Sequence, residues 1–263
     1  MSSDPRPFPN YTELSIAGWQ SSRRRDPVET LWTVRATEPQ DYVVLPDGRA
    51  DLIARFRIAA DGTCGDIVPL LVGPSSLHHS VRIEPGDGFV GVRLRPGRLG
   101  FLRDASDLRD RQLAGDAAVR MVPALAALPK RTNSIDALVG AFREFIRALG
   151  ESAAIGELET ALDRLHLAGG RIAPGDLARA LDLGPRRLHR LFARHVGLSP
   201  QLYAAVLRFQ RGVRLRRRGM PVAATAYEAG FADQSHMTRA FKRYGDFTPA
   251  SVPDVTLGWM PLR

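Results

Sequence analysis

Basic side chains recur along one helical face in the last third of the chain. Arg186, Arg190 and Arg194 stand four residues apart, so on an α-helix they share one face. Leu188 and Phe192 fall on the opposite face, where they can pack into a core. The guanidinium group is a planar fork of donors that matches phosphate oxygens and the edge of guanine. This spacing therefore predicts a helix that enters the major groove of DNA.

A second set of polar side chains follows in the run 221–245, and it repeats the pattern of the first. Met237 occupies the place that Leu188 occupies 49 positions earlier. Two similar units at this interval indicate an internal duplication. The side chains expected to face DNA are Arg186, Arg187, His189, Arg190 and Arg194 in the first unit, and Gln234, Ser235, Thr238, Arg239 and Lys242 in the second.

Each polar helix needs a preceding helix and a tight turn to hold it. Before the first, an apolar helix ends at Leu183-Gly184, where glycine removes the Cβ that a tight turn would crowd. Pro185 then suits the first turn of the next helix, where a missing N–H costs nothing. Before the second, a short helix ends at Gly230, and Asp233 can cap the helix that follows. Both units are therefore predicted to be helix-turn-helix motifs.

The run 199–218 joins the two units and predicts one continuous helix. Ser199 can cap this helix and Pro200 can begin it. About 19 residues at a rise of 1.5 Å give a helix of about 28 Å. One turn of B-DNA is about 34 Å, so the sequence predicts that one chain reads two successive major grooves on the same face of the duplex.

Residues 171–252 resemble the DNA-binding region of the AraC/XylS family of bacterial regulators. In the first half the resemblance rests on Leu188, Arg190, Phe192, Gly197, Ser199-Pro200, Arg208 and Gln210. In the second half it rests on Ala226, Ala229-Gly230-Phe231, Asp233-Gln234-Ser235-His236, Phe241, Arg243 and Thr248-Pro249. The run AGFADQSHMTRAFKRYGDFTP, which ends at Pro249, is its most specific part.

The resemblance implies a transcription regulator with double-stranded DNA as its partner, and not an enzyme. It implies base contacts from Arg186, His189 and Arg190 in the first unit, and from Ser235, Thr238 and Arg239 in the second. His236 is expected to pack at the start of its helix. Asp246 stands where the family commonly has glycine. Because Asp tolerates a left-handed backbone better than most residues, the fold is expected to be kept.

The charge of the chain is distributed unevenly. Residues 171–263 hold 16 Lys and Arg against 6 Asp and Glu, whereas residues 1–170 hold 21 against 22. A basic region joined to a neutral one is typical of a protein with a polyanionic partner. The lone Cys64 excludes an intramolecular disulfide and a cysteine-rich zinc site, and neither a metal nor a cofactor is expected. No run approaches 18 apolar residues, so the expected protein is cytoplasmic, nucleoid-associated and without a membrane span.

Residues 1–115 predict a β-rich domain, residues 116–169 a helical connector, and residues 170–263 the DNA-binding domain. The β-rich runs, separated by Gly, Pro and Asp turns, are Thr30–Val34, Tyr42–Leu45, Leu52–Ile58, Ile67–Val72 and Phe89–Leu94. The predicted fold class is thus α+β, with a small β-barrel or sandwich and following helices, then an all-α domain of two helix-turn-helix units.

The runs LPDG at 45–48 and GVRLRPG at 91–97 resemble an uncharacterised sensor-like domain that precedes the DNA-binding region in some family members. This resemblance implies effector binding or dimerisation and identifies no ligand. Trp19 and Trp32 are the candidate residues for a small-molecule effector, with core packing as the equal alternative.

Two other hypotheses for the N-terminal part stay open. One is an enzyme of the DNA-repair or modification type that carries an appended DNA-binding head. The other is a dimerisation module, in which the helix 134–149 pairs its apolar stripe with a second copy to give a homodimer. RNA polymerase is a further expected partner of a transcription regulator.

Overall fold

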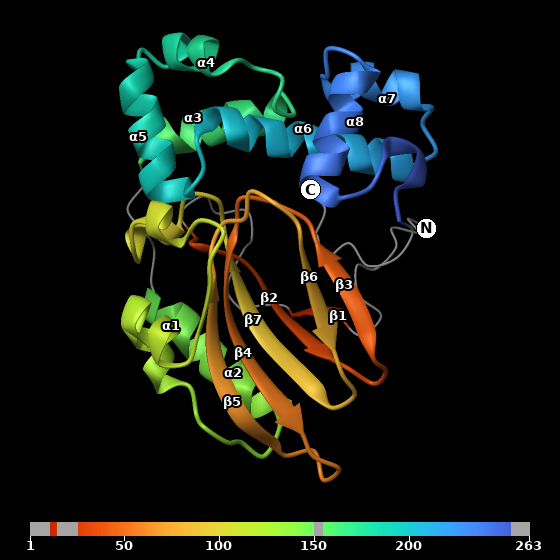
Figure 1. Cartoon of the computed structure of the whole chain (residues 1–263). Helices are drawn as coiled ribbons and strands as arrows, with labels where there is room; N and C mark the ends of the chain where they lie inside the picture. Colours follow the sequence, from red (N-terminus) through yellow and green to blue (C-terminus); the bar gives the residue numbers. More distant parts are fainter. Residues whose placement is uncertain (1–10, 15–25, 150–154, 254–263) are drawn as a thin grey trace.

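The computed structural model describes residues 11–14, 26–149 and 155–253 and shows a β domain beneath a helical domain (Figure 1). The strands are β1 Tyr11–Leu14, β2 Val28–Arg35, β3 Gln40–Val44, β4 Ala50–Ile58, β5 Cys64–Val72, β6 His79–Ile83, β7 Asp87–Leu94 and β8 Gln112–Ala114. The helices are α1 Asp116–Met121, α2 Ile135–Leu149, α3 Gly156–Leu167, α4 Pro174–Ala180, α5 Pro185–Val196, α6 Pro200–Arg217, α7 Val222–Ala229 and α8 Gln234–Gly245. The α+β class predicted from the sequence is confirmed.

The β domain is an open sandwich. Its larger sheet is antiparallel with the order β1-β2-β7-β4-β5-β8, and a second sheet pairs β3 with β6. Since β1 and β8 are not paired with each other, the predicted barrel is wrong and the predicted sandwich is confirmed. Side chains alternate across a strand, so Leu31 joins the core on one face while Trp32 and Val34 pack with Tyr42 on the other. The small sheet covers this second face.

The amphipathic helix α2 packs against β7 and completes the larger core of the β domain (Figure 1). Its apolar stripe is buried and consists of Leu138, Val139, Phe142, Phe145 and Ile146. Helix α3 instead packs into the core of α4, α5 and α6. The two main helices of the predicted connector therefore belong to different cores. The stripe of α2 is occupied within the chain, which removes the basis of the hypothesis that it pairs two copies.

The helical domain is built along α6. Ser199 caps α6 by accepting a hydrogen bond from the Leu202 amide at 3.2 Å. Helices α3, α4 and α5 pack on one part of α6, and α7 and α8 pack on another. Asp246 follows α8 with φ of 58°, which is the left-handed conformation expected at this position. No helix in the described ranges is long and apolar enough to cross a membrane.

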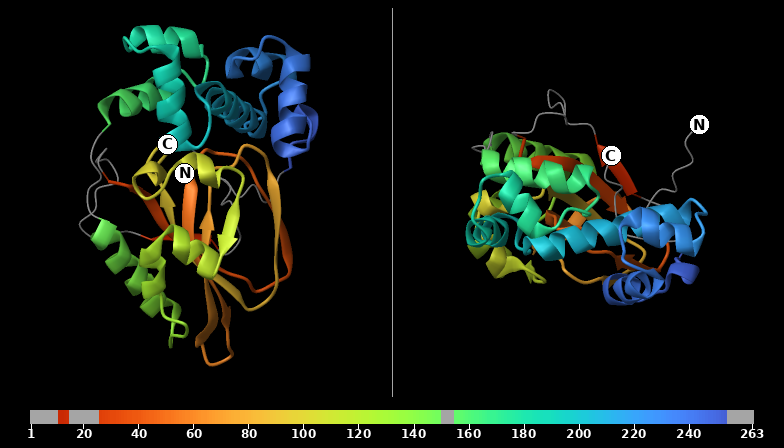
Figure 2. Two further views of the ribbon diagram at one scale, coloured as in Figure 1. Left: turned by 60° about the vertical axis from the view of Figure 1, so that its left-hand side comes forward. Right: turned by 90° about the horizontal axis from the view of Figure 1, so that it is seen from above.

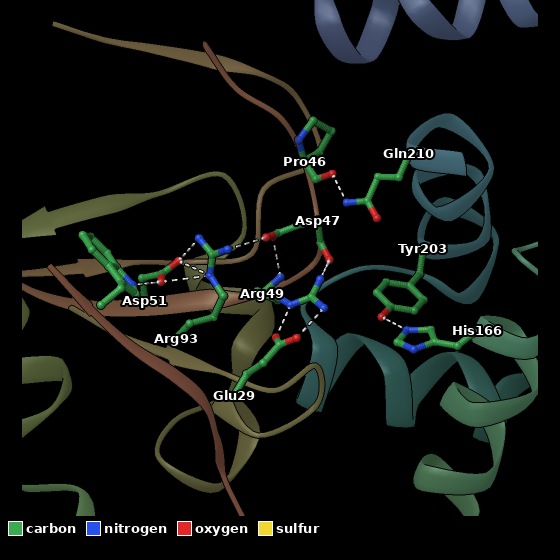
Figure 3. Close-up of polar contacts among 10 residues, drawn as sticks. Glu29, Pro46, Asp47, Arg49, Asp51, Arg93, His166, Tyr203 and Gln210 are labelled. Carbon is green, nitrogen blue, oxygen red and sulfur yellow. Dashed lines mark hydrogen bonds and ion pairs between the residues drawn. The ribbon is translucent and has the colours of Figure 1, made fainter. Parts of the chain in front are cut away.

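The β domain docks on the helical domain at several places, among them the end of α5 and the middle of α6. The short 3₁₀ helices η1 Leu99–Phe101 and η2 Ala105–Leu108 pack against the end of α5, where the Phe101 ring lies 5.5 Å from that of His195. The loop 45–49 between β3 and β4, called the docking loop, packs against α6 (Figure 3). The two domains therefore share a packed interface.

A partly buried histidine at this interface makes stability depend on pH. The Nε2 of His166 lies 2.6 Å from the Tyr203 hydroxyl (Figure 3). Burial, aided by the charge of Arg49, lowers the pKa of His166 from 6.5 to about 4; Glu29 opposes the shift and Arg214 adds to it. The unfolded chain thus binds this proton more readily than the folded protein between these pH values.

We expect the free energy of unfolding to fall as the pH drops from 6.5 to 4, with a contribution from His166 of up to about 3 kcal/mol. Urea unfolding of the wild type and of His166→Gln at several pH values measures this contribution. It is the difference between the two free energies of unfolding at each pH. Other histidines cancel in that difference. A difference that stays constant over this range would contradict the assignment.

Candidate nucleic-acid interface

Helix α5 is the first predicted recognition helix, and its two faces separate as the sequence predicts. Pro185 occupies its first turn, and Gly197 ends it in the left-handed conformation, with φ of 78°. Leu188, Phe192 and Val196 are buried in the core with α3, α4 and α6. The five side chains expected to face DNA are all exposed, namely Arg186, Arg187, His189, Arg190 and Arg194. The basic stripe therefore lies on the free side of the helix.

One arginine of α5 differs from the others. Arg187 donates a hydrogen bond to the carboxylate of Glu157 in α3 at 2.8 Å. Arg186, Arg190 and Arg194 have no hydrogen bond or ion pair from their side chains within the part of the chain that the structure describes. An unpaired guanidinium can meet a phosphate or a base without first breaking a contact. These three arginines are therefore the main basic contacts that α5 offers.

Helix α8 is the second predicted recognition helix. The Asp233 carboxylate caps it by accepting from the His236 amide at 2.6 Å. Its core face buries Met237, Ala240 and Phe241. The side chains expected to face DNA are all exposed, namely Gln234, Ser235, Thr238, Arg239 and Lys242.

Internal contacts engage some of the exposed side chains of α8. The Thr238 hydroxyl donates to the Gln234 carbonyl at 2.9 Å, and Lys242 lies 3.5 Å from the Asp246 carboxylate. The His236 ring packs edge-on against Phe231, as expected for a residue at the helix start. Gln234, Ser235 and Arg239 keep side chains without such contacts among the described residues, so these three are the most exposed and unengaged side chains of α8.

Helix α6 joins the two predicted recognition helices. Figure 1 shows α5 and α8 at the two ends of α6, and the view from above in Figure 2 shows α6 as the bridge between them. Its 18 residues span about 27 Å. This length is close to the pitch of B-DNA, about 34 Å. The length of α6 is therefore of the same order as one turn of a duplex.

Several arginines of α6 serve the fold. Arg208 donates to the Gly170 carbonyl at 2.5 Å, Arg216 to the Pro249 carbonyl at 2.7 Å, and Arg217 to the Pro253 carbonyl at 3.3 Å. These carbonyls lie in loops and short turns, outside the α-helices and the strands. The basic residues of this domain are therefore of two kinds, those that bind loop carbonyls within the fold and those that are exposed on α5 and α8.

The candidate effector residues have different outcomes. Trp19 lies outside the described residues. Trp32 packs between the two sheets with 9% of its surface exposed, and its Nε1 donates to Asp51 at 3.2 Å. It thus takes the role of a core residue, which was the alternative. Within the described residues, no group of three or more His, Cys, Asp or Glu could hold a metal ion.

Two features of the structure have no clear signal in the amino-acid sequence. Glu157 was not distinguished from other acidic residues of its helix, although it pairs with Arg187. The docking loop was interpreted as an ordinary turn because it contains Pro46, Asp47 and Gly48. Only the resemblance of LPDG to part of a known domain marked that loop as unusual.

Comparison with known proteins supports the assignment of the helical domain. Residues 177–252 match the family model described as "Helix-turn-helix domain". The transcriptional activators RhaS of Salmonella arizonae and Salmonella newport are each 34% identical over 77 residues, which is 29% of this chain and 28% of the relative. The chain thus spans less than a third of the length of these curated relatives.

Solved structures of one protein align with most of the chain at low scores. The 1.65 Å structure of ToxT from Vibrio cholerae aligns with 84% of this chain and 96% of its own, at a TM-score of 0.44 and 13% identity. The structure of ToxT with a bound unsaturated fatty acid aligns with 95% of this chain and 98% of its own, at a TM-score of 0.42 and 13% identity.

Proposed function

We propose that this chain, whose residues 177–252 form a helix-turn-helix domain of the AraC type, is a sequence-specific DNA-binding transcription regulator. One observation carries the proposal: α5 and α8, both held on α6, expose polar and basic faces while their apolar faces are buried. Arg186, Arg190 and Arg239 make the contacts to base edges, since a bidentate arginine distinguishes guanine by about 1–3 kcal/mol.

The β domain is proposed to regulate this head in response to a small-molecule effector. The support is its packing against α5 and α6, the helices that carry and join the recognition surfaces. A ligand that binds two arrangements of this interface with different affinity would shift the population between them. As a transcription regulator, the protein is also proposed to contact RNA polymerase.

Selection of bound DNA from a random duplex library with the purified chain tests the proposal. We expect an enriched site with two half-sites whose centres lie about 10–10.5 base pairs apart, the repeat of B-DNA. The same selection with the double variant Arg190→Ala/Arg239→Ala is the control and is expected to lose most of the enrichment. A wild-type pool that does not differ from the input library would contradict the proposal.

A further inference from the structure

The docking loop contacts the cores of both helix-turn-helix units. Leu45 is 1% exposed and belongs to the apolar core of the second unit, with Phe209 and Phe241. Three positions later, Gly48 lies against the ring of Tyr203, which belongs to the core of the first unit with Phe192. A single segment of the β domain therefore contacts both of the units that α6 joins.

The contact at Gly48 is closer than any other residue would allow. Gly48 has φ of 69°, and a Cβ at this position would lie 2.5 Å from Cε2 of Tyr203. Tyr203 cannot move aside easily, since it is fully buried and its hydroxyl lies 2.6 Å from His166. Only glycine meets both the backbone conformation and the space.

A buried hydrogen bond fixes the loop to the centre of α6. The Nε2 of Gln210 donates to the Pro46 carbonyl at 2.9 Å (Figure 3), and Gln210 is 0% exposed. An amide buried without a partner costs about 1–3 kcal/mol. Gln210 therefore favours the docked arrangement, because its donor has its partner only in the other domain.

A chain of buried and partly buried charges holds the docking loop to the sheet (Figure 3). Arg49 pairs with Glu29 of β2 and donates from its amide to the Asp47 carboxylate at 2.9 Å. Arg93 of β7 lies 3.7 Å from Asp47 and 3.1 Å from Asp51. The position of the loop thus follows the position of the sheet.

We propose that the docking loop is a positioning element of the DNA-reading head, through which the β domain sets the distance between half-sites that the chain accepts. Because Leu45 and Gly48 touch different cores, the loop holds the two recognition helices at one separation. Without it, bending of α6 and tilting of either unit would let the head fit several separations. This inference rests on the proposed function.

The experiment compares three DNA duplexes built from the selected site. The first keeps the selected spacing, the second has one base pair inserted between the half-sites, and the third has one half-site scrambled. Dissociation constants are measured for the full-length wild type and for Gly48→Ala and Gln210→Leu. Gly62→Ala is the matched control, since Gly62 has φ of 83° but no atom within 4 Å of an added Cβ.

For the wild type and Gly62→Ala, we expect the insertion to weaken binding about tenfold or more, the range of a mismatched position. For Gly48→Ala and Gln210→Leu, we expect the inserted base pair to weaken binding less than about threefold. These two variants should bind the duplex with the selected spacing more weakly than the wild type does. Their binding to the duplex with a single intact half-site should be unchanged. This last readout separates positioning from a general loss of folded protein.

The inference would be overturned if Gly48→Ala and Gln210→Leu both lost as much affinity as the wild type does on insertion of the base pair. It would also be overturned if these variants lost as much affinity for the single half-site as for the full site. Because the two variants perturb different contacts, failure of one to fold leaves the other as the test. Failure of the wild type itself to prefer any duplex would instead count against the proposed function.

Discussion

Replacement of Arg239 by alanine is expected to weaken binding to the selected DNA site by about 5- to 150-fold and to change binding to random DNA much less. The lost bidentate contact to a base edge is worth about 1–3 kcal/mol. Arg239 is exposed on α8 and has no ion pair among the described residues, so its removal does not disturb the fold. Equilibrium titration of both DNA types at one fixed salt concentration measures the two effects.

The control for this prediction is Arg82→Ala, which removes the same charge from β6, outside the helical domain. The salt dependence of binding follows the number of phosphates that are neutralised, and so a distant charge has little effect. We expect Arg82→Ala to bind both DNA types as the wild type does. An equal loss of specific and random binding in Arg239→Ala would show that this arginine contacts phosphate, and not a base.

Substitution of Glu29 by glutamine is expected to lower the free energy of unfolding by about 3–5 kcal/mol, the cost of leaving one member of a buried ion pair alone. Its partner Arg49 has a side chain only 4% exposed and cannot lose its proton. The buried guanidinium would therefore keep its full charge after losing its direct ion-pair partner, with the more distant charge of Asp47 left to compensate it. Urea unfolding at pH 7 measures the effect.

The reverse substitution, Arg49→Met, is expected to cost less than Glu29→Gln. Arg49 holds the pKa of Glu29 at about 2 against the desolvation that opposes it, and without Arg49 the carboxyl can take up a proton. A lowered pKa contributes stability that is present above pH 4.5 and is lost as the pH falls towards 2. Glu29→Gln should therefore also lack this acid-dependent loss. The prediction fails if Arg49→Met proves the more destabilising variant.

Both substitutions also bear on the docking loop, because Arg49 is its last residue. A loop released from the sheet is expected to lose its hold on α6 before the helix-turn-helix units unfold. The stability experiment and the half-site experiment thus examine the two ends of the same chain of contacts, one in the sheet and one at Gln210.

The two helix-turn-helix units could be predicted in detail because local rules govern them. The arginines at 186, 190 and 194 share a face at a spacing of four residues, and the structure exposes all three. Ser199 and Asp233 cap the helices that were expected to begin after them. Periodicity, caps and left-handed positions involve residues within one or two turns, so the sequence displays them directly.

The β domain was predicted only as a class. The alternating runs indicated strands, but the order β1-β2-β7-β4-β5-β8 and the choice of sandwich over barrel depend on which strands pair. The apolar stripe of α2 is equally suited to a partner chain and to the sheet of its own domain. Tertiary packing decided both questions, since a stripe or a strand face does not specify what covers it.

The amino-acid sequence alone therefore determined the two helix-turn-helix units, their duplication and the length of the helix that joins them. The tertiary structure decided that Arg187 is paired, that Trp32 is buried in the core, and that the loop at 45–49 holds α6. The physical reason is the distance along the chain. Pro46 and Gln210 lie 164 residues apart, and the bond between them exists only once two separately folded cores meet.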